Sequence, residues 1–471
     1  MFKTDIYINR RHALRNLVPS GVVLFLGHAE SPVNYAGNTY RFRQDSNFLY
    51  FFGLNLPGLA GVIDIEEGTD CIYGDDPDIE DIIWTGNLPS MEELAARAGI
   101  SSVWPYRDLR IKLLSAIRKG RKIHFAPPYR GDSKIILSEL LGIRIGELDN
   151  YSSKKLIKSI VQLRSEKEPC EIEEIEKACD TGYEMHTLAM RMCKPGIFEY
   201  QITGVMEGVA GAANGMTSFP SIQSQNSEIL HNHSHNNILQ SGRMLVTDAG
   251  AETYMGYASD FTRTIPVDGK FTAKQLDIYN IVLAANNLAQ EIAKPGVFYF
   301  DVHIAAAKVI AEGLKSVGLM KGNVDDAVQS GAHALFFPHG LGHMMGLDVH
   351  DMEDLGEKYV GYDDEIQRST QFGTANLRLG RRLKKNFVLT VEPGIYFIPA
   401  LITKWEAEKI NSSFINFHKI KEYLDFGGIR LEDNIVVTDT GCRRLGQKRI
   451  PITKEEVEEE MNKNVKNILK K

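Results

Sequence analysis

The pattern of apolar and polar positions changes along the chain near residue 150. Before that point, short apolar runs alternate with amphipathic stretches. Runs of this length between turn residues predict strands, namely GVVLFLG, NFLYFFGL, LAGVIDI and DIIWTG. Helical spacing predicts helices for SMEELAARAGI and for the stretch after Tyr106. Alternating strands and helices predict an α/β domain over residues 1–155.

A longer helical pattern follows the basic run SSKKLIKSIVQLRSEKEP and predicts a second domain over residues 156–471. It contains an internal echo, KPGIFEY at 194–200 and KPGVFYF at 294–300, each between two helical patterns. Lys-Pro-Gly ends a helix because Pro disfavours helical conformation in the residue before it and Gly allows the turn. The echo predicts two related halves packed face to face, although KPG is also a common helix stop.

Strand-like patterns lie between these helices. Residues 244–267, MLVTDAGAETYMGYASDFTRTIPV, predict a hairpin with its turn near residues 254–256. FVLTVEPGIYF and GIRLEDNIVVT predict two more strands. Asp248 and Asp260 are an even number of residues apart, so alternation across a short turn brings them to one face. We expect a curved antiparallel sheet backed by helices, with a site on its concave face.

Residues of metal-binding type punctuate this second domain: Asp248, Asp260, His343, Glu392 and Glu432. Asp248 follows the apolar run MLVT, and burial of an unpaired carboxylate is costly unless its pKa rises until it is neutral. A single Asp before Ala-Gly also caps a turn, but turns explain four such acids poorly. If they converge, two divalent cations would neutralise them. Carboxylates with one imidazole suit Mn²⁺, Co²⁺, Zn²⁺ or Fe²⁺, and paired ions about 3.5–4 Å apart activate water.

Two of the histidines are spaced as in the zinc motif HExxH. His339 and His343 are four residues apart, but position 340 is Gly, so the general-base Glu of that motif is missing. Gly340 and Gly342 also disfavour a helix, which predicts a loop or strand that approaches a site closely. His350 follows, beside an Asp that would orient its ring. A core histidine is the usual explanation for each one alone.

The tract HNHSHNN at 231–237 fits either an exposed loop or a metal-binding segment. His231 follows the apolar pair at 229–230 and is the member that we expect in the pocket. The last stretch, KEEVEEEMNKNVKNILKK, is typical of a solvated charged helix, and we assign it no role.

Bulk properties exclude several classes of function. Of the 471 residues, 43% are hydrophobic and 24% charged, as in soluble globular proteins, and the net charge of −7 leaves no basic footprint for nucleic acid. No apolar run has the length of a signal-peptide core or of a membrane span. Five cysteines without a CxxC pair favour a cytoplasmic protein with reduced thiols. Without a GxSxG elbow or a Gly-rich phosphate loop, amide hydrolysis is the natural reaction.

Five segments in this order resemble the aminopeptidase P and prolidase group of the M24-type pita-bread metallopeptidases: TDAG, SDFTRT, HGLGHMMGLDVHD, TVEPGIY and GIRLED. The resemblance covers residues 160–446 and continues into YRFRQDSNFLYFFG at 40–53, which looks like that group's substrate-side domain. It implies an α/β N-terminal domain followed by an α+β pita-bread domain with two pseudo-symmetric halves. It also implies a homodimer, two divalent ions (usually Mn²⁺), and cleavage between an N-terminal residue and a following proline.

The resemblance assigns roles to the metal-type residues. It implies that Asp248 and Glu392 bind different ions, that His343 joins Glu392, and that Asp260 and Glu432 bridge the two ions. Glu392 would also move the proton of the bridging hydroxide. Other matches fall on histidines that position substrate and stabilise the tetrahedral intermediate, and on an arginine beside the bridging Glu: His231, His339, His350 and Arg430.

Two departures from the family pattern affect the shape of one loop and the length of substrate. QSQNS at 223–227 stands where the family often has GSGEN, and the long segment through FINFHKIKEYLDFGG resembles prolidase of the eukaryotic type. Arg378, in LRLGRRL, matches an arginine that binds a dipeptide's C-terminal carboxylate in those prolidases, although an arginine in a loop is usually solvated. Dipeptides and longer peptides both stay open as substrates. An inactive pita-bread binding module is the other alternative, but such relatives typically lose metal ligands.

Overall fold

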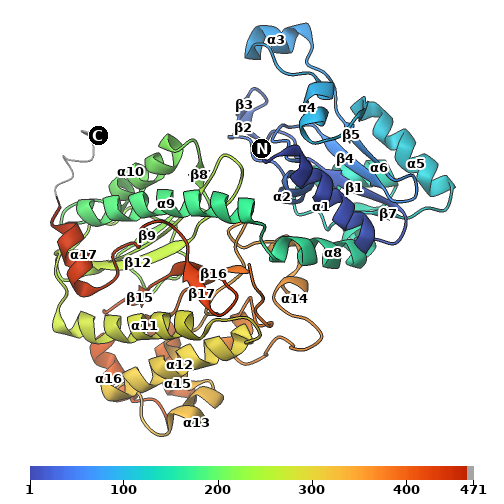
Figure 1. The fold of residues 1–471 in the computed structure, drawn as a ribbon. Helices are drawn as coiled ribbons and strands as arrows, with labels where there is room; N and C mark the ends of the chain where they lie inside the picture. Colours follow the sequence, from blue (N-terminus) through green and yellow to red (C-terminus); the bar gives the residue numbers. More distant parts are fainter. Residues whose placement is uncertain (464–471) are drawn as a thin grey trace. The chain divides into compact units, whose positions relative to one another are not determined.

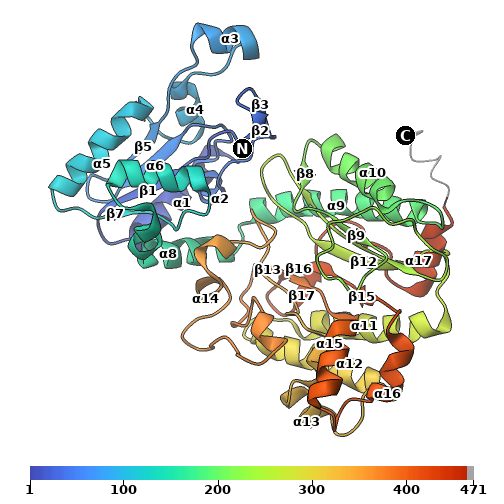
Figure 2. The same ribbon diagram turned by 180° about the vertical axis from the view of Figure 1, so that it is seen from behind.

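The computed structural model describes residues 1–463, which form two compact units. The first unit contains residues 1–164 together with 352–359, and the second contains the rest of the described chain. Figure 1 colours the chain from blue to red, and Figure 2 shows the same ribbon from behind.

The first unit is an α/β unit built on one mixed sheet. Its helices are α1 (Thr4–Leu17), α2 (Ser46–Phe52), α3 (Ile79–Thr85), α4 (Met91–Arg97), α5 (Leu109–Arg118), α6 (Gly131–Leu141), α7 (Leu148–Tyr151) and α8 (Lys154–Ser165). Its strands are β1 (Val22–Leu26), β2 (Pro32–Tyr35), β3 (Asn38–Thr39), β4 (Ala60–Asp64), β5 (Thr69–Tyr73), β6 (Ser102–Trp104) and β7 (Ile123–His124). The sheet order is β6-β5-β4-β1-β7, antiparallel at its centre and parallel at both edges.

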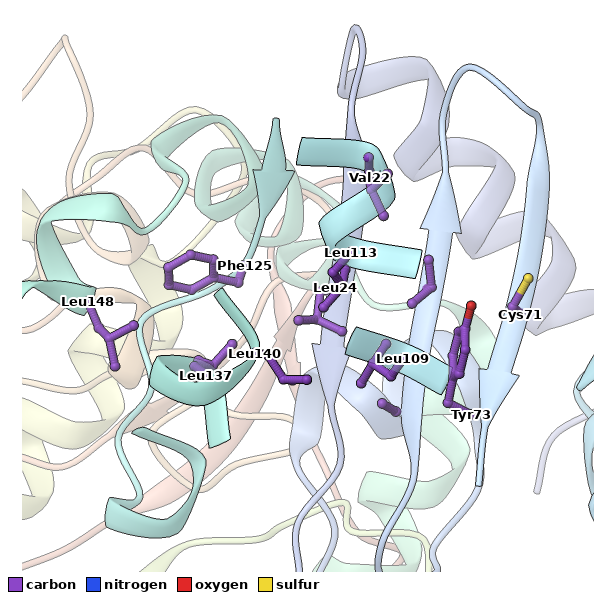
Figure 3. Packing of buried hydrophobic residues seen from close by; sticks show 13 residues of the cluster. Val22, Leu24, Cys71, Tyr73, Leu109, Leu113, Phe125, Leu137, Leu140 and Leu148 are labelled. Carbon is purple, nitrogen blue, oxygen red and sulfur yellow. The ribbon is translucent and has the colours of Figure 1, made fainter. Parts of the chain in front are cut away.

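One face of this sheet packs on helices α5 and α6. Val22 and Leu24 of β1 lie in one buried cluster with Leu109 and Leu113 of α5 (Figure 3). α5 presents these two residues one turn apart, as an amphipathic helix does. The strand predictions for GVVLFLG and LAGVIDI and the helix predictions for α4 and α5 are confirmed.

Two predicted strands of the first unit are helices instead. NFLYFFG forms most of α2, where the Asp45 side chain accepts a hydrogen bond from the Phe48 N–H at 2.9 Å and Gly53 ends the helix at φ 68°. Every residue of α2 is buried, so its unbroken apolar run reflects burial on all sides rather than strand periodicity. DIIWTG falls within α3, which begins with a capping box between Asp78 and Asp81. In both segments the capping interactions favour a helix over a strand.

The second unit contains longer helices and several short antiparallel ladders. Its helices are α9 (Pro169–Met192), α10 (Glu199–Ala212), α11 (Ala273–Ile292), α12 (Tyr299–Ser316), α13 (Val324–Gln329), α15 (Pro399–Glu408), α16 (Phe417–Ile420) and α17 (Lys454–Met461), while α14 (Glu357–Val360) lies where the chain re-enters the unit. Its strands are β8 (Met216–Thr217), β9 (Ile222–Ser224), β10 (Met244–Ala249), β11 (Ala251–Glu252), β12 (Phe261–Pro266), β13 (Val388–Val391), β14 (Gly394–Tyr396), β15 (Gly428–Arg430), β16 (Asp433–Val437) and β17 (Cys442–Arg444).

Within this unit the strands lie between two helical layers. Ladders β12-β10-β9, β13-β16-β17, β14-β15 and β11-β8 are antiparallel. Helices α9 and α10 lie on one side of these strands and α11 and α12 on the other (Figures 1 and 2). Among the described residues, no helix has the length and apolar character that crossing a membrane requires. Of the predicted C-terminal charged helix, α17 is observed with Val457 buried, and residues 464–471 lie outside the described residues.

The two Lys-Pro-Gly segments occupy equivalent places. One joins α9 to α10 and the other joins α11 to α12. Gly196 and Gly296 both have φ 87°, a conformation that favours glycine. The Gly196 N–H donates to the Leu239 carbonyl and the Gly296 N–H to the Leu383 carbonyl, each at 2.9 Å. The two segments thus share the same backbone conformation and an equivalent hydrogen bond, as the prediction of two related halves requires.

Candidate metal centre

Asp248 and Asp260 are brought together by the pairing of β10 with β12. The antiparallel register places Asp248 opposite Thr262, so Asp260 lies two residues away on the same side. The connection turns at Gly256, where φ is 88°. The Asp260 N–H donates to the side chain of Asn434 at 2.9 Å, which fixes this carboxylate to the neighbouring strand β16. Both carboxylates are buried.

His343 lies in a loop, as predicted, and not in a helix. Its N–H donates to Thr390 Oγ1 at 3.1 Å, which holds the loop against β13. Its Nδ1 lies 2.9 Å from the Met344 carbonyl oxygen, and a ring nitrogen facing a carbonyl carries the proton. Its Nε2 faces Asp260 Oδ2 at 3.4 Å and Glu392 Oε1 at 3.6 Å.

Glycine allows this loop to run directly along β13. A Cβ at Gly342 would lie 2.1 Å from the carbonyl oxygen of Thr390, which is closer than these atoms can approach. The Glu392 N–H donates to the Leu341 carbonyl at 2.8 Å, just beyond the same contact. The close approach at Gly342 therefore sets the positions of both His343 and Glu392.

The Thr262 hydroxyl and the Arg430 guanidinium group connect Glu432 with Asp248. Thr262 Oγ1 donates to Glu432 Oε2 at 2.7 Å and accepts from Arg430 Nε at 3.1 Å. Arg430 also donates through Nη2 to Asp248 and through Nη1 to the Tyr396 hydroxyl at 2.8 Å. β12 and the β15–β16 segment are thus locked side by side with their acids facing one another.

The five residues predicted as metal ligands converge in the structure. Their ligand atoms form overlapping groups within 4.8 Å, namely Asp248, Asp260 and Glu432; His343, Glu392 and Glu432; and Asp260, His343 and His350. Glu432 links the first two groups, and Asp260 links the first and third. The prediction that acids distant in sequence meet on one side of the strands matches this geometry.

The buried negative charge of the cluster would be stabilised by cations. Burial raises the pKa of Asp260 to about 6 and that of Glu392 to about 7, and neighbouring carboxylates add to both shifts. Burial also raises the pKa of Glu432 well above its usual range. Among the described residues, Asp260 Oδ1 and Glu432 Oε1 are buried without a hydrogen-bond partner. Buried carboxylate oxygens beside one imidazole nitrogen fit divalent metal ions.

Three further histidines stand around this cluster. The His350 ring lies 4.0 Å from the His343 ring between centroids. His339 places Nδ1 2.8 Å from the Gly340 carbonyl oxygen and Nε2 2.9 Å from the Tyr396 hydroxyl. Burial lowers the pKa of His339 to about 3, so its ring is neutral.

His231 interacts electrostatically with Asp248 of the cluster and with Arg378. Burial lowers the pKa of His231, and the charges of Arg430 and Arg378 lower it further, which places both guanidinium groups near this ring. No candidate ligand group in the described part of the chain includes His233 or His235, and the HNHSHNN tract is a loop. The structure therefore brings His231 and Arg378 toward the acids and leaves the rest of the tract apart.

Sequence reasoning did not single out three polar residues that connect the ligands: Thr262, Tyr396 and Asn434. Each has a side chain that bonds to a residue of the cluster or to its immediate partners. A signal was present, because Thr262 and Asn434 are polar residues in strands that are buried along their whole length. A buried polar side chain must find a partner, and here Thr262 bonds to the Glu432 carboxylate and Asn434 to the backbone of Asp260.

The chain is similar to known metallopeptidases over most of its length. Residues 173–439 match the family model described as metallopeptidase family M24, and residues 7–124 match the aminopeptidase P N-terminal domain. The chain is 33% identical over 455 residues to the Xaa-Pro dipeptidase of Homo sapiens, covering 94% of this chain and 89% of that protein. It is 30% identical over 449 residues to the Xaa-Pro aminopeptidase of Escherichia coli K12, covering 93% of each. The structure of zinc-substituted E. coli aminopeptidase P in complex with product superposes with a TM-score of 0.78, 28% identity and 98% coverage of each chain.

Proposed function

The chain belongs to metallopeptidase family M24, and from this membership we propose that it hydrolyses the bond between an N-terminal residue and a following proline. The observation that carries the proposal is the buried cluster of the five predicted ligands, with carboxylate oxygens that lack partners among the described residues. The likeness to an Xaa-Pro dipeptidase and to an Xaa-Pro aminopeptidase supports the same reaction. An inactive binding module is not favoured, because every predicted ligand is present.

We propose that the centre holds two divalent ions and that both are Mn²⁺. Asp248, Asp260 and Glu432 would hold one ion, and His343, Glu392 and Glu432 the other. Asp260 also faces His343 at 3.4 Å, which supports a bridging position for Asp260 beside Glu432. The ions would supply a water nucleophile at neutral pH and polarise the scissile carbonyl.

The chain's own groups would handle the proton and the substrate. Glu392 is only partly buried, so its carboxylate is placed to take a proton from the attacking water and give it to the departing proline nitrogen. We assign the positioning of the peptide and the stabilisation of its developing oxyanion to His231, His339 and His350. Arg430 would hold Asp248 in place through its Nη2 bond.

Arg378 is our candidate for recognition of a free carboxylate. It is half-buried, and its charge acts on His231. A guanidinium group recognises a carboxylate through a fork of two N–H groups. The C-terminal carboxylate of a dipeptide would reach such a position, whereas that of a longer peptide would lie farther along. This placement supports a dipeptidase, and the substrate length tests it.

The experiment compares kcat/KM for Ala-Pro and Ala-Pro-Ala with added Mn²⁺. Arg378→Ala is expected to lower kcat/KM for Ala-Pro about 10–100-fold, the worth of a hydrogen bond to a charged group, and to leave the tripeptide nearly unchanged. Arg382→Ala is the matched control, because Arg382 is an exposed arginine of the same segment that pairs with Glu365. An unchanged rate on Ala-Pro in the Arg378 variant rejects the carboxylate role, and preference of the native protein for Ala-Pro-Ala identifies an aminopeptidase.

Metal analysis tests the wider proposal. Purified protein equilibrated with Mn²⁺ is expected to retain two ions per chain and to lose peptidase activity when a chelator removes them. A protein that binds no divalent ion and cleaves neither peptide would instead be a binding module.

We also propose a cytoplasmic location and a homodimer. The described residues contain five free cysteines, which fits a reducing compartment, and the family resemblance suggests the dimer. Light scattering of the purified protein tests the dimer, and cell fractionation tests the location.

A further inference from the structure

A pocket of the second unit lies beside β16 and β17, and none of the five predicted metal ligands lines it. It is a cavity of about 570 Å³. We call this cavity the arginine pocket. Its charged lining residues are Glu291, Asp433, Arg443, Arg444, Lys448 and Arg449. Asp433 follows Glu432 directly in sequence but lines this separate cavity. The volume lies within the range of about 300–1,000 Å³ that is usual for small-ligand sites.

Positive charge in the arginine pocket exceeds the acids available to it. Asp433 already accepts from Arg263 Nη2 at 2.7 Å and from Gln290 Nε2 at 3.1 Å. Arg443 is paired with Glu176. Within residues 1–463, Arg444 has no ion pair, and Lys448 has only a contact with the ring of Tyr183.

Arg449 shows the imbalance most clearly. Its Nη2 lies 3.9 Å from Asp433 Oδ2, too far for a hydrogen bond. In the described residues, its Nε and Nη2 are buried atoms without a hydrogen-bond partner. Burial lowers the pKa of Arg449, attraction to Asp433 offsets part of this shift, and repulsion from Arg444 and Arg263 adds to it. A guanidinium group with unused donors beside like charges needs an anion.

The charges indicate which anion would fit. The lining carries four positive side chains, Arg443, Arg444, Lys448 and Arg449, against the two acids Glu291 and Asp433, which gives a net charge of +2. A phosphoryl group carries about −1.5 to −2 charge at neutral pH and offers three acceptor oxygens. Arginine forks bind phosphate oxygens in pairs, and Arg449 presents Nε and Nη2 on one edge of its fork. We propose that the arginine pocket binds a small phosphate dianion, either inorganic phosphate or the phosphoryl group of an organic monophosphate.

Calorimetric titration of the full-length protein tests this site. Inorganic phosphate and AMP are titrated at constant ionic strength, once with Mn²⁺ bound and once after chelation. Binding in the arginine pocket is expected in both states, whereas phosphate bound at the metal-type cluster would require the ions. The inference does not depend on the peptidase activity, so either proposal can fail alone. Tighter binding of AMP identifies an organic phosphate, and equal binding identifies the phosphoryl group alone as the ligand.

The paired variant Arg444→Gln/Arg449→Gln is expected to weaken phosphate binding about ten-fold or more, because each lost bond joins charged groups. Lys385→Gln/Lys404→Gln removes the same charge from exposed positions of the second unit and is expected to change the affinity less than about two-fold. If the arginine pair fails to melt cooperatively, the exposed Arg444→Gln alone replaces it. Absence of phosphate binding to the native protein, or equal binding to the arginine variant, overturns the proposal.

Discussion

Replacement of Thr262 by Val tests how the cluster is held together. Thr262 Oγ1 makes two bonds to charged groups, at 2.7 Å to Glu432 and at 3.1 Å from Arg430. Valine keeps the branched shape and removes both bonds. A hydrogen bond to a charged group contributes about 1.5–3 kcal/mol, so loss of the bond to Glu432 alone corresponds to about 10–150-fold. Thr262→Val is expected to weaken Mn²⁺ binding within that range.

The direction follows from the protonation state of Glu432. Burial raises the pKa of Glu432 well above its usual range, and the Thr262 hydroxyl opposes that shift by stabilising the carboxylate. Without the hydroxyl, the pKa of Glu432 rises further. Metal binding requires the ionised carboxylate, so the affinity falls and falls more steeply as the pH is lowered.

The assay is a calorimetric titration of Mn²⁺ into metal-free protein at pH 7 and pH 6, followed by kcat/KM on Ala-Pro. Thr262→Ser keeps the hydroxyl and serves as the control, with an affinity close to the native value. The reasoning is refuted if Thr262→Val binds Mn²⁺ as tightly as the native protein does. It is equally refuted if Thr262→Ser is impaired as much as Thr262→Val.

Three other predictions concern stability. Gly342→Ala should lower the free energy of unfolding in urea by about 1–3 kcal/mol and weaken Mn²⁺ binding, because its Cβ would meet the Thr390 carbonyl at 2.1 Å. Gly204→Ala, in open space on α10, should instead raise that free energy by about 0.5–1 kcal/mol. Burial lowers the pKa of His303 to about 3 and of His333 to about 4, so between about pH 4 and pH 6.5 only the unfolded chain gains these protons. As the pH is lowered in this range, the free energy of unfolding of the metal-free protein should therefore fall by about 1.4 kcal/mol per pH unit for each histidine. The same pH slope in His303→Leu as in the native protein would contradict this.

The five residues of the cluster could be singled out in the sequence because each one interrupts an apolar strand or stands beside glycine. Asp248 and Asp260 needed only the alternation of a strand and a short turn, both local properties. The equivalent halves were visible in the repeated Lys-Pro-Gly, whose glycines share one backbone conformation. Residues that act within short segments can be recognised in the sequence, whereas the fold that brings the segments together cannot.

Other features depended on information that periodicity does not contain. The seven residues of α2 are buried on every side, so the caps at Asp45 and Gly53 were the only local sign of a helix. The bonds of Thr262 and Tyr396 join residues more than 30 positions apart, which no local pattern specifies. The return of residues 352–359 to the first unit also leaves no change in composition that would mark it.

The equivalence of the two helix–turn–helix halves has a consequence for how the enzyme is assembled. The first half contributes Asp248 and Asp260, while His343, Glu392 and Glu432 all come after the second Lys-Pro-Gly. One half alone would carry only part of the five predicted ligands and would need the other half to bind a cation. Ions bound by this set would join the two halves, and their removal should then loosen both halves together.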